Sequence, residues 1–181
     1  MKHRTGASIA GALGVLVCLM VPALAQLGTA VGTLSVTIDG EAYEGETLDV
    51  PSEGTSTATV QSFGPVTTLT IQAHDPQSDS IMRNVMAVEL SLMGSDASAS
   101  IMEASVSWWP GGMGEPFYYS EGSGTATDIV IDTLTLEDGA EAIQGSVSGM
   151  LCRRDSFFAD PDMDDCRMVE GTFDTPLLKA E

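Results

Sequence analysis

Apolar and polar residues alternate one by one along most of the chain after Gly32. The alternation is clearest in eight segments: 33–39, 56–63, 65–73, 84–92, 98–108, 127–136, 141–151 and 167–174. A period of two residues is typical of strands that bury one face. Turn-forming pairs such as Asp39-Gly40, Gly64-Pro65 and Asp138-Gly139 separate the segments. The pattern therefore predicts an all-β protein, an antiparallel β-sandwich or barrel of about 8–10 short strands.

Residues 80–93 form the one stretch in which the alternation competes with another signal. This stretch contains three methionines and one alanine, Ala87, residue types that favour helices. We expect it to be partly helical.

The N-terminus has the pattern of a secretory signal. MKHR is followed by an uncharged run, and Ala23-Leu24-Ala25 forms a small-residue cleavage site. The alternative is an uncleaved anchor, because the run approaches the roughly 20 residues that span a bilayer. We expect residues 1–25 to be a cleaved signal, 26–32 a short lead-in, 33–175 a single β domain and 176–181 a tail. Export would place the protein in the periplasm or outside the cell.

Cleavage changes the charge of the chain. The full sequence has 7 basic and 26 acidic residues. Removing Lys2 and Arg4 leaves 5 basic residues, so the net charge becomes 5 − 26 = −21. Such a charge repels nucleic acid and anionic membrane surfaces, and we expect the exported protein to bind neither. The oligomeric state is not fixed by these features.

Cleavage also removes Cys18 and leaves Cys152 and Cys166, which we expect to form a disulfide in an oxidising compartment. If the two cysteines face each other across an antiparallel hairpin, glycines 149, 171 and 145 face Val169, Val147 and Phe173. Val147, Leu151, Ile143, Val169 and Phe173 then fall on one face and Ser146, Ser148, Glu170, Thr172 and Asp174 on the other. This sorting predicts the register.

The segment between the cysteines, CRRDSFFADPDMDDC, is predicted to be a 13-residue loop. It contains five aspartates: Asp155, Asp160, Asp162, Asp164 and Asp165. Calcium takes six to eight oxygen ligands, which alternating aspartates on a tight loop can supply. The spacing does not match an EF-hand, since Asp165 and Gly171 stand where its glycine and glutamate belong. The alternatives are an irregular calcium site and a solvated acidic loop.

A second candidate surface is SWWPGGMGEPFYYSEG, residues 107–122. It contains aromatic and acidic residues that suit a sugar ligand: Trp108, Trp109, Tyr118, Tyr119, Glu115 and Glu121. Neighbouring residues of a strand point to opposite faces, so the two tryptophans cannot share one platform. The alternative is that one of each aromatic pair belongs to the core.

Catalytic motifs are not evident, and no residue is predicted to be catalytic. The single histidine after the signal, His74, is expected at the surface, and no zinc, phosphate-loop or dinucleotide motif occurs. The sequence favours a non-enzymatic binding or structural domain, with calcium or a glycan as its ligand. The alternative is a small carbohydrate-binding or two-carboxylate carbohydrate-active protein, with Glu115 and Glu121 as the acid pair.

Overall fold

The computed structural model describes residues 28–180, which form strands without any helix. The strands are β1 (Thr29–Ile38), β2 (Glu41–Val50), β3 (Thr55–Ser56), β4 (Ala58–Phe63), β5 (Val66–His74), β6 (Val85–Met93), β7 (Ser100–Trp109), β8 (Phe117–Tyr119), β9 (Asp128–Thr135), β10 (Ala142–Arg154), β11 (Asp162–Pro176) and β12 (Leu178–Lys179). All pairings are antiparallel except that of β12 with β4. The prediction of an all-β, mostly antiparallel protein is confirmed.

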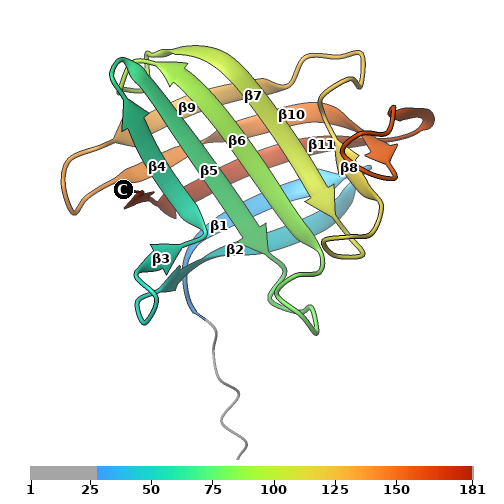
Figure 1. Cartoon of the computed structure of the whole chain (residues 1–181), viewed down its shortest axis with the longest axis horizontal. Helices are drawn as coiled ribbons and strands as arrows, with labels where there is room; N and C mark the ends of the chain where they lie inside the picture. The colour runs from blue at the N-terminus through green and yellow to red at the C-terminus, as the bar shows by residue number, and fades with distance from the viewer. Residues whose placement is uncertain (1–27, 181) are drawn as a thin grey trace, which may run out of the picture.

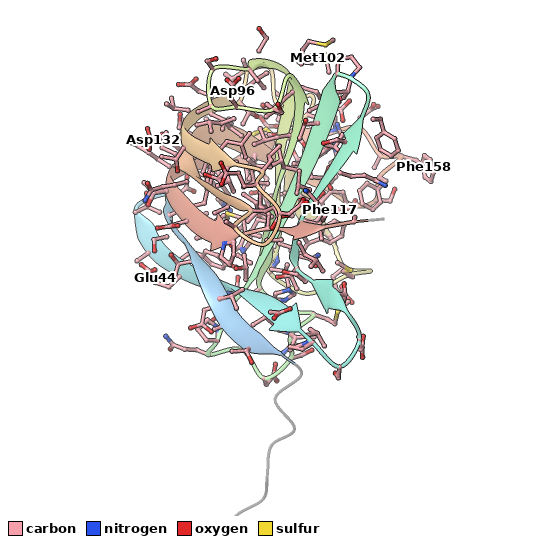
Figure 2. The ribbon with its side chains drawn as sticks, turned by 90° about the vertical axis from the view of Figure 1, so that its left-hand side faces the viewer. Glu44, Asp96, Met102, Phe117, Asp132 and Phe158 are labelled. Carbon is pink, nitrogen blue, oxygen red and sulfur yellow. A yellow bond between two sulfur atoms is a disulfide. The ribbon has the colours of Figure 1, made fainter. Side chains whose placement is uncertain are left out.

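The strands form two layers that cross one another, as in a sandwich (Figure 1). One layer has the order β12-β4-β5-β6-β7, and the other contains β9, β10, β11, β1 and β2. The short strand β8 pairs with both β7 and β10 and so joins the layers on one side. On the other side a single bridge between Glu46 and His74 links β2 to β5. Figure 2 shows the two layers from the side.

The core lies between the layers and follows from the period of two. Alternate residues of β1, such as Leu34 and Val36, face alternate residues of the other layer, such as Leu69, Ile71 and Val88, and all five are at most 4% exposed. Burial of apolar side chains on the inner faces is the main force that holds such layers together.

The last hairpin has the predicted register. Cys152 lies opposite Cys166, and the two are joined by a disulfide. Gly145 lies opposite Phe173, whose ring would be only 2.8 Å from a β-carbon at position 145. A larger residue at position 145 would therefore collide with the aromatic ring, which explains the large–small pairing.

The expectation of a partial helix in residues 80–93 is wrong. Residues 85–93 form the strand β6, in which four successive residues, 85–88, are buried. Both faces of β6 are covered at residues 85–88, so burial does not alternate there as it does along the rest of the strand. His74 is also buried rather than at the surface, and its Nδ1 lies 2.6 Å from the carbonyl oxygen of Ile81.

The predicted signal lies outside the described residues. β1 begins at Thr29, within the predicted lead-in, and β12 lies in the predicted tail. Within residues 28–180 there is no helix that could cross a membrane. The disulfide is compatible with an oxidising, exported environment.

Candidate functional site

The two tryptophans at the end of β7 point to opposite sides of their layer, as strand geometry requires. Trp108 and Tyr118 pack against the main core between the layers. Trp109 and Phe117 instead form a separate buried cluster with Val85 on the outer side. The candidate segment 107–122 therefore contributes to two different surfaces.

On the outer side, the rings of Trp109 and Phe117 stack face to face, with centroids 4.1 Å apart and planes 6° from parallel. Phe157 covers both rings, at 5.4 Å from Trp109 and 4.8 Å from Phe117. Phe157 comes from the segment between the cysteines, so the two regions selected from the sequence meet here. We call Trp109, Phe117 and Phe157 the outer aromatic cluster.

Two further aromatic residues flank the outer aromatic cluster. Phe158 is fully exposed and projects away from the ribbon (Figure 2). Tyr119 lies beside Arg154, whose guanidinium carbon is 5.5 Å from the ring centroid. Burial, together with the nearby carboxylates of Glu121 and Glu89, raises the pKa of Tyr119 above its ordinary value.

On the inner side, Trp108 lines a pocket of about 410 Å³ at the end of the sandwich. The pocket, which we call the Trp108 pocket, is lined by apolar, aromatic and charged residues: Ile38, Asp39, Glu41, Ala42, Tyr43, Asn84, Trp108 and Arg167. Its volume falls within the roughly 300–1,000 Å³ of small-molecule sites, which also combine apolar walls with a few polar groups.

Asn84 is the central polar residue of the Trp108 pocket. Its side-chain oxygen accepts a hydrogen bond from Trp108 Nε1 at 2.8 Å, and its amide nitrogen donates to Asp75 at 2.7 Å. Its backbone carbonyl accepts a hydrogen bond from the Tyr43 hydroxyl at 2.9 Å. Asn84 has a left-handed backbone with φ of 52°, a conformation that non-glycine residues adopt rarely and Asn most readily. These contacts fix the orientation of the Trp108 ring.

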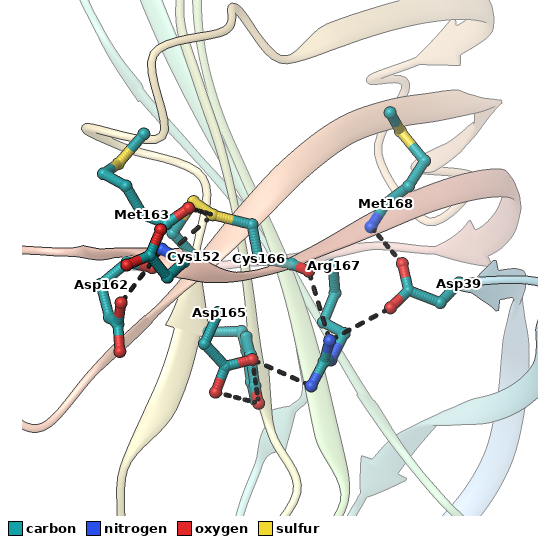
Figure 3. Close-up of polar contacts among 10 residues, drawn as sticks. Asp39, Cys152, Asp162, Met163, Asp165, Cys166, Arg167 and Met168 are labelled. Carbon is teal, nitrogen blue, oxygen red and sulfur yellow. Dashed lines mark hydrogen bonds and ion pairs between the residues drawn. A yellow bond between two sulfur atoms is a disulfide. The ribbon is translucent and has the colours of Figure 1, made fainter.

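Arg167 forms the charged wall of the same pocket. Its guanidinium lies between Asp165, at 2.9 Å, and Asp39, at 3.4 Å, as Figure 3 shows. It also lies over the ring of Tyr118, whose hydroxyl is 3.2 Å from Asp165. Tyr118, and then Asp165 and Asp39, raise the pKa of Arg167. Arg167 is therefore held in place and its charge is balanced by the two aspartates.

Asp39 is held equally firmly on its side of the pocket. It occupies the turn between β1 and β2, and its Oδ1 accepts a hydrogen bond from the backbone nitrogen of Met168 at 2.8 Å. Tyr43, which also lines the pocket, is buried, and its single hydroxyl proton lies within reach of two carbonyl oxygens, those of Ala73 at 3.0 Å and Asn84 at 2.9 Å. Burial raises the pKa of Tyr43 well above its ordinary value.

The five aspartates of the predicted calcium loop do not converge. The strands continue beyond the cysteines, to Arg154 in β10 and from Asp162 in β11, so the connecting loop is shorter than the predicted 13 residues. Asp155 forms an ion pair with Arg153 at 2.8 Å, and Asp162 accepts the backbone N–H of Asp164 at 3.0 Å. Asp165 faces Tyr118 and Arg167, and Asp160 lies exposed in the loop.

Within residues 28–180 no group of three or more acidic, histidine or cysteine side chains is arranged to hold a metal ion. A calcium site at the aspartates would require Asp155 and Asp165 to exchange their arginine partners for the ion. Calcium binding stays a prediction.

The two carboxylates of the predicted acid pair line different pockets. Glu115 lines a small apolar pocket of about 200 Å³ beside Trp109 and Phe158. Glu121 lines a different groove, formed by β7 and residues 120–127. The arrangement does not place the two carboxylates on one pocket, as a glycosidase requires.

The sequence did not identify Asn84, Asp39, Glu41 and Arg167 as site residues. Asp39-Gly40 was visible only as a turn signal, and Arg167 only as the residue after a cysteine.

Comparisons with known proteins add no further guide, because no protein family, no curated protein and no solved structure matches this chain.

Proposed function

We propose that this chain is an exported, non-enzymatic binding domain that takes a carbohydrate in the Trp108 pocket. The observation that supports this proposal is the position of Trp108. Its ring lines a pocket together with two carboxylates, an amide and a guanidinium. Sugars present apolar C–H faces and many hydroxyls, so an aromatic ring beside hydrogen-bonding groups matches both parts of the ligand.

The charge of the site narrows the class of sugar. Arg167 is balanced by Asp39 and Asp165, which leaves Glu41 as a further acidic group on the pocket. The whole chain is also strongly negative, with a formal charge of −19. Anionic sugars would be repelled, so the ligand is a neutral or amino-bearing saccharide. Export through the predicted signal would expose the pocket to such ligands in the periplasm or outside the cell.

The two tryptophans allow a direct fluorescence test. They are the only ones in the chain, so Trp109→Phe leaves Trp108 as the sole reporter, and Trp108→Phe leaves Trp109. Each variant is titrated with a panel of neutral, amino-bearing and anionic saccharides. We expect a saturable change in fluorescence for Trp109→Phe with a neutral or amino-bearing member, and none for Trp108→Phe.

A matched pair of variants checks that the response comes from this pocket. Asn84→Gly keeps the left-handed backbone but removes the hydrogen bond to Trp108, and we expect it to weaken binding about tenfold. Glu115→Gln changes a carboxylate outside the pocket and should leave affinity unchanged. The proposal is wrong if no saccharide in the panel is bound, or if Trp108→Phe responds as strongly as Trp109→Phe.

A further inference from the structure

The edge of β7 that faces β8 is only partly paired. β8 has three residues, and it pairs with β7 only at Ser107 and Trp108. The pairing ends with two hydrogen bonds of Val106, one from its N–H to the Ser120 hydroxyl and one from Ser120 N–H to its carbonyl, each 2.9 Å. Among the described residues no strand pairs with this edge before Val106.

A groove runs along this unpaired part of β7. Its volume is about 420 Å³, with Ile101, Met102, Glu103, Ala104 and Ser105 on one side and Ser120–Gly122 and Thr125–Thr127 on the other. In an antiparallel strand, alternate residues direct their N–H and C=O to the same side. Ala104 therefore directs its peptide groups away from β6, as Val106 does, and towards the groove.

Backbone groups at an open sheet edge are ready to pair with another extended chain. We propose that this edge is a strand-addition site for an extended, basic peptide segment of a partner protein. The incoming strand would receive a hydrogen bond from Ala104 N–H and donate one to the Ala104 carbonyl, which continues the ladder that β8 leaves incomplete.

The side chains around the groove indicate which residue types the partner's segment should contain. Ile101 and Met102 are 38% and 49% exposed, so they offer apolar contact. Glu103 and Glu121 supply negative charge, and the whole chain adds to it. A strand that alternates apolar residues with lysine or arginine matches both features. A second copy of this acidic chain does not, because like charges repel.

This site is separate from the Trp108 pocket, since the two share no lining residue. The experiment can therefore fail without affecting the proposed function. The probe is a fluorescent heptapeptide of alternating lysine and valine, and its binding to the full exported domain is measured by anisotropy. Two control peptides have the same sequence, with alternate backbone nitrogens methylated along one edge or along the other.

We expect the unmodified peptide to bind, and one of the two methylated peptides to bind at least tenfold more weakly, because only one edge of the peptide faces β7. Ala104→Pro removes the N–H on the groove side without removing a bond to β6, and should weaken binding by a similar factor. If that variant does not fold, Glu103→Lys with Glu121→Lys serves instead and should weaken binding of the basic peptide.

Three results would overturn the proposal. The first is equal binding of all three peptides, which would indicate charge attraction without strand pairing. The second is no binding of the unmodified peptide at millimolar concentration. The third is light scattering that shows a dimer of the parent chain and a monomer of Ala104→Pro, which would place a second copy at this edge.

Discussion

Trp108 and Trp109 are adjacent in the chain, and each stacks on another ring and donates an indole hydrogen bond, yet their burial and their charged neighbours differ. Trp108 is half-buried, with its indole nitrogen bonded to Asn84 beside charged residues of a pocket. Trp109 is almost fully buried and stacks on Phe117 under Phe157. The Trp108 ring stacks on Tyr118 and lies beside the charged groups of a pocket, whereas the Trp109 ring is enclosed between other aromatic rings. Neighbouring aromatic residues on a strand can therefore line a pocket on one side and fill a buried cluster on the other.

The substitutions with the largest expected effect on stability remove the two tryptophan rings, one at a time. Trp109→Ala should lower the free energy of unfolding by about 3–5 kcal/mol, because it empties a buried aromatic stack. Trp108→Ala should cost less, about 2 kcal/mol, because its side chain is only half-buried. Urea unfolding measures both, and Trp109→Phe is the control that retains a ring. Equal losses for the two alanine variants would contradict the division between stability and recognition.

The disulfide lies next to residues of both regions. Cys152 pairs with Tyr119, which flanks the outer aromatic cluster, and Cys166 precedes Arg167, which lines the Trp108 pocket. Replacing both cysteines by alanine should cost about 3 kcal/mol, the chain-entropy value for a loop of this length. The loss should appear in urea unfolding, and saccharide titration should show weaker binding as well. The single substitution Ser156→Ala, in the same loop, is a control that should change neither quantity.

Alkaline pH tests the inner side through Tyr43, and the variant at this position separates its effect from that of Tyr119 on the outer side. Its pKa is raised on folding, so above pH 10 the unfolded chain releases the proton while the folded chain keeps it. Stability is therefore present below pH 10 and falls as pH rises, by up to about 1.4 kcal/mol per pH unit from this group. Tyr43→Phe should be less stable at pH 7, by about 1 kcal/mol, but should lose less stability than the parent between pH 10 and 11. Identical slopes would show that another group is responsible.

Two neighbouring phenylalanines at the surface of the outer aromatic cluster should contribute differently to stability. Phe157→Ser should cost about 1 kcal/mol, because Phe157 contacts both stacked rings. Phe158→Ser should change the free energy of unfolding by less than about 0.5 kcal/mol, since the side chain is fully exposed. A large loss for Phe158→Ser, measured by urea unfolding, would mean that this ring packs against the protein in solution.

The smallest expected effect concerns calcium. Salt should stabilise so acidic a chain by screening its repulsion. If Asp155 and Asp165 keep their arginine partners, CaCl₂ should raise the melting temperature no more than NaCl of equal ionic strength. A rise of roughly 5–10 °C specific to calcium would instead indicate a saturated site. Loss of that rise in Asp162→Asn with Asp164→Asn, but not in Asp128→Asn with Asp132→Asn, would locate the site at the loop.

The fold could be predicted from the sequence wherever one face of a strand is apolar. The last hairpin is the best example, because glycine opposite Val169 or Phe173 fits only one register. β2 was missed because its inward residues are Tyr43, Gly45 and Thr47, which do not form an apolar series. Thr47 is buried because its hydroxyl pairs with that of Thr175 at 2.7 Å, a partner 128 residues away.

The candidate site was predicted less completely than the fold, because contacts between residues far apart in the sequence leave no local pattern. Trp108 was identified by its own chemistry, but Asn84, in the loop before β6, and Arg167, in β11, are brought to it only by the folded chain. The length of the acidic loop was also misjudged. β10 continues past Cys152 because it pairs with the three residues of β8, which are too few to predict as a strand.

The position of β1 has a consequence for the order in which the protein is made. β1, the first strand, lies between β2 and β11, the last long strand. During synthesis, β1 can pair with β2 at once, but it has no second neighbour until residues 162–176 have emerged. The layer of β9, β10, β11, β1 and β2 can therefore be completed only after residues 162–176 have been made, and the Cys152–Cys166 disulfide closes at the same late stage. Such long-range pairing predicts slow folding, on a scale of roughly milliseconds to seconds.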